Sequence, residues 1–231
     1  MSTTPPRNIN LAFSDKYGRD HAQAYFRKHH DGLSRRLSHW RDVQVARRAL
    51  ALAGEPQLVL DLPCGAGRFW PLLAEHPKRE IIAADNSPDM LAVARRMQAP
   101  ALVDRVRTMQ TSAFDIDLPP ASVDCVFCMR LLHHIGEHDH RMRMLRELHR
   151  VSRDTAIVSL WVDGNFKAWR RKRLESDRAR RERRGYQNRF VLPVDAAERE
   201  FAEAGFDVVG KLDFLPYYAM WRTYVLRKSA A

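Results

Sequence analysis

Apolar and polar positions divide the chain into short apolar runs separated by longer amphipathic stretches. The clearest apolar runs end near residues 61, 85, 129 and 162, and each has the length of one buried strand. Segments between them carry apolar residues at steps of three and four, which is the spacing of helices that cover a sheet. This alternation of strands and helices predicts an α/β fold with a mostly parallel sheet.

The same patterns set the expected order of elements. Residues 1–10 are expected to be a disordered tail, and 163–192 an exposed basic helix followed by an aromatic turn. Seven apolar residues at helical spacing predict the helix 33–53, which Gly54 and Pro56 end. Strands are predicted at 58–61, 81–85, 103–111, 122–129, 155–162, 206–214 and 217–227, and further helices at 13–26, 68–75, 88–97, 137–151 and 194–204.

A glycine turn after the first apolar run is the chemically informative part of the chain. The run 58–61 stops at an acid, and Gly65 and Gly67 then let the backbone turn sharply and approach a ligand closely. The next strand ends at Asp85, eighteen residues after Gly67, where a carboxylate can accept hydrogen bonds from a ribose. Strand, turn, helix, strand and acid therefore form one βαβ unit with a nucleoside site.

Two features of this turn argue against a dinucleotide ligand. A dinucleotide fingerprint needs a third glycine three residues after the second, and that position is Trp70. The carboxylate of Asp61 would also repel phosphates. A nucleoside with a cationic aminoacyl sulfonium group and no phosphate suits the turn better.

These residues and three later motifs resemble the class I S-adenosylmethionine-dependent methyltransferases. The resemblance is strong over residues 57–163 and weak in the C-terminal part. Pro63 stands where the family usually has glycine, which stiffens the turn and leaves its two glycines in place. The matching motifs are Asp61-x-x-Cys64-Gly65-x-Gly67, Asp85, Phe114-Asp115-x-x-Leu118-Pro119, Ser122-Val123-Asp124-Cys125-Val126-Phe127 and Leu131-Leu132-His133-His134-Ile135.

The resemblance implies a Rossmann-like fold, with a seven-stranded, mostly parallel sheet, an antiparallel last strand and helices on both faces. It implies a single methyltransferase domain over residues 11–231, in which 11–55 are a helical lid over the cofactor and 163–192 a basic insertion. The alternative for 11–55 is that these helices only cover one face of the sheet.

The resemblance also implies that S-adenosyl-L-methionine is the cofactor. The glycine turn is expected at its aminoacyl part, Asp85 at the ribose, the loop after the third strand at the adenine, and the end of the fourth strand at the methionine. Ser112 or Asp115 takes the adenine-side position where relatives often have an acid. The expected cofactor-binding residues are Asp61, Pro63, Cys64, Gly65, Gly67, Asp85, Asn86, Ser112, Ala113, Phe114, Cys128 and Arg130, of which Arg130 is alternatively a substrate contact or a surface ion pair.

Methyl transfer requires an acceptor atom aligned about 3 Å from the methyl carbon and shielded from water. A hydroxyl acceptor also needs a base, for which His133 and His134 after the fourth strand are the candidates. The alternatives are a structural pair at a helix entry and a metal site with His138 and His140, which has no companion acid at a recognised spacing, so no metal is expected. Candidate substrate contacts, with packing as the alternative, are Tyr17, Arg27, Trp161 and Tyr218.

Charge bears on the acceptor. The 231 residues have a formal net charge of +11, and residues 167–189 hold eleven Lys or Arg and three acids, so most of the excess is local. We expect methylation of an O or N atom of a small, anionic acceptor. The alternative is an RNA-modifying methyltransferase that holds nucleic acid with 167–189, although the fourth strand lacks the Pro-Pro or Leu-Pro motif of exocyclic-amine methylases.

Three further interpretations of the segment 167–189 remain open. It is a binding arm of an inactive methyltransferase, an anionic-membrane contact with Phe166 and Trp169 as shallow anchors, or a solvated helix. The presence of both Asp61 and Asp85 argues against the inactive form.

Composition predicts a soluble, cytoplasmic protein, and we expect a monomer or homodimer. The sequence has no run of 18 apolar residues, and its first residues lack the apolar core of a signal peptide. Three cysteines give no disulfide framework. Cys125 and Cys128 have an odd separation on a predicted strand, so they are expected in the core on opposite faces of the sheet.

Overall fold

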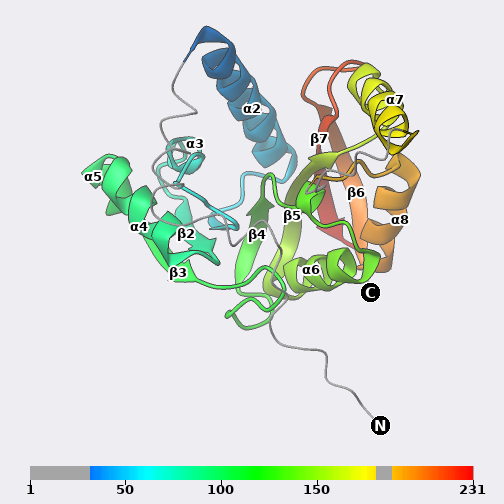
Figure 1. The fold of residues 1–231 in the computed structure, drawn as a ribbon. Coiled ribbons are helices and arrows are strands. Elements are labelled where there is room, and N and C mark those ends of the chain that lie inside the picture. Colours follow the sequence, from blue (N-terminus) through cyan, green and yellow to red (C-terminus); the bar gives the residue numbers. More distant parts are fainter. Residues whose placement is uncertain (1–31, 181–188, 231) are drawn as a thin grey trace.

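The computed structural model describes residues 32–180 and 189–230, which form a seven-stranded sheet with helices on both faces (Figure 1). The strand order is β3-β2-β1-β4-β5-β7-β6. Strand β7 runs antiparallel to β5 and β6, and the other neighbouring pairs are parallel, which confirms the predicted architecture. The strands are β1 (Leu58–Asp61), β2 (Glu80–Asp85), β3 (Val106–Gln110), β4 (Val123–Cys128), β5 (Ser152–Trp161), β6 (Phe206–Asp213) and β7 (Trp221–Lys228).

Alternating side chains build one apolar layer on each face of the sheet. Val59 and Cys125 belong to the layer under α2, α3 and α4, whereas Leu60 and Cys128 belong to the layer under α6 and α8. The two cysteines therefore lie on opposite faces, as their separation predicts. The helices are α2 (Leu33–Leu52), α3 (Trp70–Leu73), α4 (Pro88–Met97), α5 (Pro100–Val103), the 3-10 helix η2 (Leu132–His134), α6 (His138–Val151), α7 (Phe166–Arg180) and α8 (Val194–Glu203).

The strand order reverses at the centre of the sheet, between β1 and β4. Their successors lie on opposite sides, so the loops that leave the carboxyl ends of β1 and β4 separate there. Open α/β sheets bind ligands in the crevice at this point. The parallel register sets Asp61 of β1 beside Ala83 of β2 and Phe127 of β4, which brings the ends of three strands to one edge.

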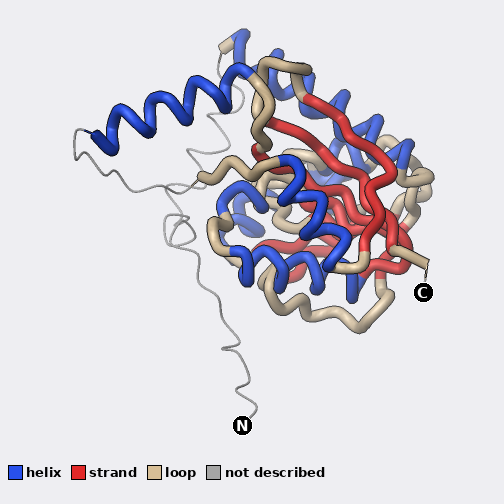
Figure 2. Tube along the Cα trace, turned by 90° about the vertical axis from the view of Figure 1, so that its right-hand side faces the viewer, coloured by secondary structure: helices blue, strands red, loops and turns tan. Residues whose placement is uncertain are grey.

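Helix α2 confirms the predicted helix over 33–53, but only its second half packs on the sheet. Leu50 is buried, whereas Leu37 is 65% and Trp40 55% exposed, although all three share the apolar spacing. Figure 2 shows the reason, because the first half of α2 extends beyond the body of the molecule. The apolar spacing therefore corresponds to a buried face only in the second half of α2.

Several predicted boundaries are also wrong, among them the start of β5, which is Ser152 and not residue 155. The helix predicted over 68–75 is the four-residue α3, because the glycine turn continues to Phe69. Strand β3 begins at Val106, because the short helix α5 precedes it, and β7 begins only at Trp221, because 214–220 form the turn after β6. The predicted tail 1–10 and helix 13–26 lie outside the described residues. Within the described ranges, no helix is both long and apolar enough to cross a membrane.

Candidate active site

Two carboxylates end the neighbouring strands β1 and β2 at the carboxyl edge of the sheet. Asp61 is 1% exposed and Asp85 is 8% exposed. Asp85 is engaged by the backbone, since its Oδ2 accepts the N–H of Gly65 and its Oδ1 accepts the N–H of Ser87, both at 2.9 Å. The second acid thereby ties the glycine turn to the start of α4.

Asp61 has a different environment. Within residues 32–180 and 189–230 its Oδ2 makes no hydrogen bond of standard geometry. Burial raises the pKa of Asp61 well above its usual range, the negative charge of Asp85 raises this pKa further, and the nearby Trp70 side chain offsets only part of the rise. Because an unmatched buried carboxylate is costly, the geometry indicates a position for a cationic or hydrogen-bond-donating ligand group.

The turn between β1 and α3 requires glycine at two positions. Gly65 has a φ of 54° and Gly67 a φ of 72°, both in the left-handed region. A Cβ at Gly67 would also lie 2.8 Å from the ring of Trp70. Trp70 is fully buried and packs directly against the turn, at the position where a dinucleotide fingerprint has its third glycine.

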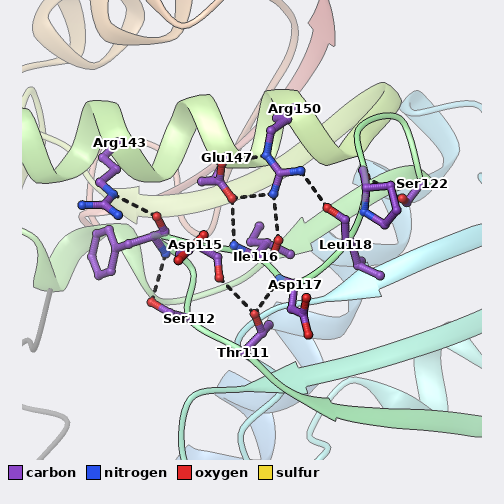
Figure 3. A network of polar contacts seen from close by, with 12 residues as sticks. Thr111, Ser112, Asp115, Ile116, Asp117, Leu118, Ser122, Arg143, Glu147 and Arg150 are labelled. Carbon is purple, nitrogen blue, oxygen red and sulfur yellow. Dashed lines mark hydrogen bonds and ion pairs between the residues drawn. The ribbon is translucent and has the colours of Figure 1, made fainter. Parts of the chain in front are cut away.

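The loop after β3 is held by three side chains of α6 (Figure 3). Arg143 Nε donates to the carbonyl of Phe114 at 2.9 Å, and Glu147 Oε2 accepts the N–H of Ile116 at 2.7 Å. Arg150 pairs with Glu147 at 2.7 Å and donates to the Ile116 carbonyl at 2.7 Å. Burial opposes ionisation, but these hydrogen bonds and the arginine charges lower the pKa of Glu147 overall. Helix α6 therefore fixes the loop in position.

The residues expected at the adenine lie on this braced loop. Ser112 Oγ accepts the N–H of Phe114 at 3.2 Å, so that backbone donor is engaged within the loop (Figure 3). Ala113 and Phe114 are buried, and of the two candidates for the acidic position Ser112 is half-buried and Asp115 exposed. The loop thus presents a compact, pre-formed edge.

The carboxyl end of β4 carries an ion-pair network that the sequence pattern does not predict. Arg130 has a φ of 64°, and its N–H donates to Ser159 Oγ at 2.8 Å. The guanidinium groups of Arg130 and Arg68 each donate to Asp42 Oδ2 at 2.5 Å. Asp42 lies on α2 and is 5% exposed. Arg130 is thus part of an internal network that ties α2 to the glycine turn and to β4.

His133 and His134 form part of an aromatic cluster at the ends of β5 and β7. The ring centre of His133 lies 3.9 Å from that of His134, 4.6 Å from Trp221 and 5.1 Å from Trp161. Antiparallel pairing sets Trp161 opposite Trp221, with ring centres 5.6 Å apart. Sequence reasoning missed Trp221, because only strand register brings it to this place.

Three guanidinium groups surround this cluster. The guanidinium carbon of Arg130 lies 4.4 Å from the ring centre of Trp221. Those of Arg171 and Arg189 lie 5.1 and 5.6 Å from the ring centre of Trp161. The pKa of His133 is lowered to about 2. Burial is the largest cause, followed by the charges of the His134 imidazole and of these arginines. His133 is therefore neutral at neutral pH and a weak base, within positively charged surroundings that favour an anionic ligand.

The remaining cofactor candidates lie along the same edge. Pro63, which follows a cis peptide bond, and the buried Cys64 are in the turn, and Asn86 is exposed directly after Asp85. Cys128 is fully buried at the end of β4, and burial raises the pKa of its thiol. Both thiols are in their neutral form.

Other candidates lie apart from the cluster. The ring of Tyr218 stacks on Phe166 at 5.8 Å, on the outer side of α7. His138 pairs with Glu200 at 2.9 Å, and among the described residues no group of three metal-ligating side chains converges. The candidates Tyr17 and Arg27 lie outside the described residues.

The family comparison agrees with this geometry. A family model described as a methyltransferase domain matches residues 59–155, the stretch that contains the glycine turn, both acids, the loop after β3 and strand β4. Residues 59–155 are therefore similar to a methyltransferase domain, and the seven-stranded sheet has the fold of class I S-adenosylmethionine-dependent methyltransferases. The matched stretch ends within β5, so the ion-pair partner Asp42 and both tryptophans of the cluster lie outside it.

Curated relatives match the methyltransferase domain over part of their length. A demethylmenaquinone methyltransferase from Thermus thermophilus is 35% identical over 125 residues, which cover 53% of this chain and 55% of that protein. An uncharacterised methyltransferase-like protein from Schizosaccharomyces pombe is 34% identical over 110 residues, 47% of this chain and 39% of that protein. The chain thus spans about half the length of these relatives, or less.

Solved structures share the fold of the methyltransferase domain. Magnesium protoporphyrin IX methyltransferase from Synechocystis PCC 6803, with bound SAH, has a TM-score of 0.75 at 16% identity, over 95% of this chain and 100% of that one. A methyltransferase from Haloferax volcanii, in complex with the Trm112 methyltransferase activator, has a TM-score of 0.64 at 16% identity, over 92% of this chain and 98% of that one. At these identities the likeness establishes the fold.

Proposed function

We propose that the chain transfers a methyl group from S-adenosyl-L-methionine to an O or N atom of a small, anionic acceptor. The observation that carries the proposal is the buried Asp61, whose Oδ2 makes no hydrogen bond of standard geometry with the described residues. The cofactor has a cationic amino group and a sulfonium and no phosphate, which fits an acidic glycine turn. When bound, it supplies an activated methyl group.

The proposed contacts follow the order of the strand ends. Asp61, Gly65 and Gly67 hold the aminoacyl part, and Asp85 holds the ribose. Both oxygens of Asp85 already accept a backbone N–H, but a carboxylate oxygen can accept a second hydrogen bond, so ribose hydroxyls can share them. The adenine lies against the loop 112–114, whose position α6 fixes. Further proposed lining residues are Pro63, Cys64, Asn86, Cys128 and Arg130.

The proposed acceptor site is the aromatic cluster of His133, Trp161 and Trp221. Flat rings surrounded by guanidinium groups suit a planar acid. With a pKa of about 2, His133 acts as a neutral hydrogen-bonding group and not as the base. An oxyanion or a neutral amine needs no base, and His134 is the proposed base for a neutral hydroxyl acceptor. Preference for aromatic acids over their neutral amides tests this acceptor class.

Helix α2 is proposed as part of the lid. Its Asp42 contacts Arg68 next to the glycine turn and Arg130 at the end of β4, on the two sides of the strand-order reversal. This bridge supports a role of α2 in excluding water from the reacting groups.

Asp61→Asn tests the cofactor assignment by calorimetric titration with S-adenosylhomocysteine. Loss of a charge-assisted contact costs about 1.5–3 kcal/mol, so the affinity should fall about 10- to 150-fold. The matched control is Asp124→Asn on β4, because Asp124 lies at the other end of the sheet, where its Oδ2 accepts the N–H of Leu58. Unchanged affinity in Asp61→Asn, or an equal loss in the control, would refute the assignment.

The same variant has a second readout that needs no ligand. The fold disfavours the charged form of Asp61, so the contribution of this one group to the stability of the free protein decreases as the pH rises above about 3.8, its ordinary pKa. Asp61→Asn should therefore unfold at a higher urea concentration than the wild type at neutral pH. A less stable variant would contradict the unmatched environment of Asp61.

A further inference from the structure

An exposed patch of aromatic and aliphatic side chains lies on the outer side of α7 and on the loop between β6 and β7. These two segments are side by side in Figure 1 and are joined by backbone hydrogen bonds. Each of the six side chains is at least 44% exposed. The patch, called here the aromatic patch, consists of Phe166, Trp169, Leu174, Leu215, Tyr217 and Tyr218.

The aromatic patch is one pre-formed unit. The N–H groups of Phe166 and Lys167 at the start of α7 donate to the carbonyls of Tyr217 and Tyr218 at 2.9 and 3.1 Å. The rings of Phe166 and Tyr218 stack with an interplanar angle of 10°. Tyr217 has a φ of 59°, which is rare for tyrosine, and its side chain is 89% exposed. The loop therefore holds this ring in solvent at a conformational cost.

Basic side chains border the aromatic patch. Lys167 Nζ lies 5.0 Å from the ring centre of Tyr218, and Arg173 Cζ lies 5.7 Å from that of Trp169. Arg170, next to Trp169 in the helix, is exposed. Tyr, Trp and Leu side chains flanked by Lys and Arg are the composition of protein surfaces that lie in the headgroup region of a membrane.

The aromatic patch faces away from the proposed acceptor site. The inner side of α7 carries Ala168, which is 1% exposed, and Arg171, which lies over Trp161 at 5.1 Å. One helix thus separates the aromatic cluster from the aromatic patch, so a large partner can cover the patch without entering the site.

We infer that the aromatic patch docks the protein on an anionic lipid surface. The basic side chains attract anionic headgroups. This attraction brings the patch to the membrane surface, where the rings and the two leucines can enter the interface. Nucleic acid fits less well, because bases stack on open ring faces. Here Phe166 and Tyr218 each cover one face of the other ring, the two leucines have no ring, and only Trp169 and Tyr217 remain for stacking.

Vesicle co-sedimentation of the full chain tests the inference. The protein should bind vesicles in which about a third of the phosphatidylcholine is replaced by phosphatidylglycerol, more weakly at high salt, and should not bind phosphatidylcholine alone. Arg170→Gln/Arg173→Gln should weaken binding about 30-fold. Trp169→Ser/Tyr217→Ser should weaken it about tenfold or more.

Trp40→Ser is the matched control, because Trp40 on α2 is 55% exposed and Trp169 is 56% exposed. All variants should melt within a few degrees of the wild type and bind S-adenosylhomocysteine normally, which separates docking from folding and from the cofactor site. Full vesicle binding by Trp169→Ser/Tyr217→Ser, an equal loss in Trp40→Ser, or equal binding to neutral vesicles would overturn the inference. Displacement of the vesicles by single-stranded RNA, together with weaker RNA binding by the patch variants, would also overturn the inference.

Discussion

Replacing Asp42 with alanine should cost far more stability than removing any surface ion pair on the same helix. The Asp42 side chain is 7% exposed and accepts hydrogen bonds from Arg68 and Arg130, whose side chains are 12% and 25% exposed. Without the carboxylate, two guanidinium groups would remain close together in a largely buried position with their mutual repulsion uncompensated. The loss of stability therefore comes from two largely buried positive charges that have lost their shared carboxylate.

The magnitude follows from burial. Removing one partner of a buried ion pair costs about 3–5 kcal/mol, and the partial exposure of Arg130 favours the lower end, so we expect a loss of about 3 kcal/mol. The matched control is Glu75→Ala, which breaks the ion pair between Arg47 on α2 and Glu75, the second residue after α3. Both side chains of that pair are at least 40% exposed, and its removal should cost below about 1 kcal/mol.

Urea unfolding at neutral pH measures both losses as differences in the free energy of unfolding. In about 1 M salt the small loss in Glu75→Ala should vanish, because surface charges are screened, whereas the loss in Asp42→Ala should persist. Equal losses in the two variants, or a loss in Asp42→Ala that disappears with salt, would refute the reasoning. An unstable Asp42→Ala is replaced by Asp42→Asn, which keeps the shape and removes only the charge.

Three further predictions concern the site. Asp85→Ala should weaken S-adenosylhomocysteine binding by roughly 1.5–3 kcal/mol in calorimetry, and unaltered affinity would refute the ribose assignment. The same variant should also lower stability, because it leaves the N–H groups of Gly65 and Ser87 without their acceptor. Below pH 6.5 the unfolded chain protonates His133, whereas the folded chain does so only near pH 2, so stability should fall as the pH drops from 6.5. His133→Asn should flatten this slope in urea unfolding between about pH 5 and 7, and parallel slopes would contradict the low pKa. Glu147→Gln should lower stability by about 1 kcal/mol and speed hydrogen exchange of the Ile116 amide, since the brace of the loop after β3 is weakened; unchanged exchange would show that α6 does not hold the loop.

The sequence alone predicts the architecture well because its signals are local. Buried parallel strands are short apolar runs, and the acids that end β1 and β2 follow such runs directly. Ser87 caps α4 and Pro88 begins it, as their residue types indicate. The opposite placement of Cys125 and Cys128 follows from strand alternation alone. Each inference needs only residues close together in the chain.

The predictions from sequence fail where the hydrophobic pattern continues beyond the part of an element that packs against the sheet. The spacing of Leu37 and Trp40 is helical, and the helix forms, but a pattern does not say where the sheet beneath it ends. The late start of β7 has a similar cause, since strand pairing begins at Trp221 opposite Trp161 and the preceding residues turn. Periodicity fixes the type of an element, and its neighbours fix its limits and its exposure.

The sequence by itself determined the order of the motifs along the chain, the glycine turn and the two acids of the proposed cofactor site. Only the tertiary structure decided that Asp42 joins Arg68 and Arg130, and that Trp221 meets Trp161 and His133 beneath three guanidinium groups. The physical reason is that backbone turns and strand ends depend on neighbouring residues, whereas ion pairs and ring contacts depend on which distant side chains the sheet register brings within a few ångströms. The neutral state of His133 belongs to this second class, because burial and distant charges set its pKa.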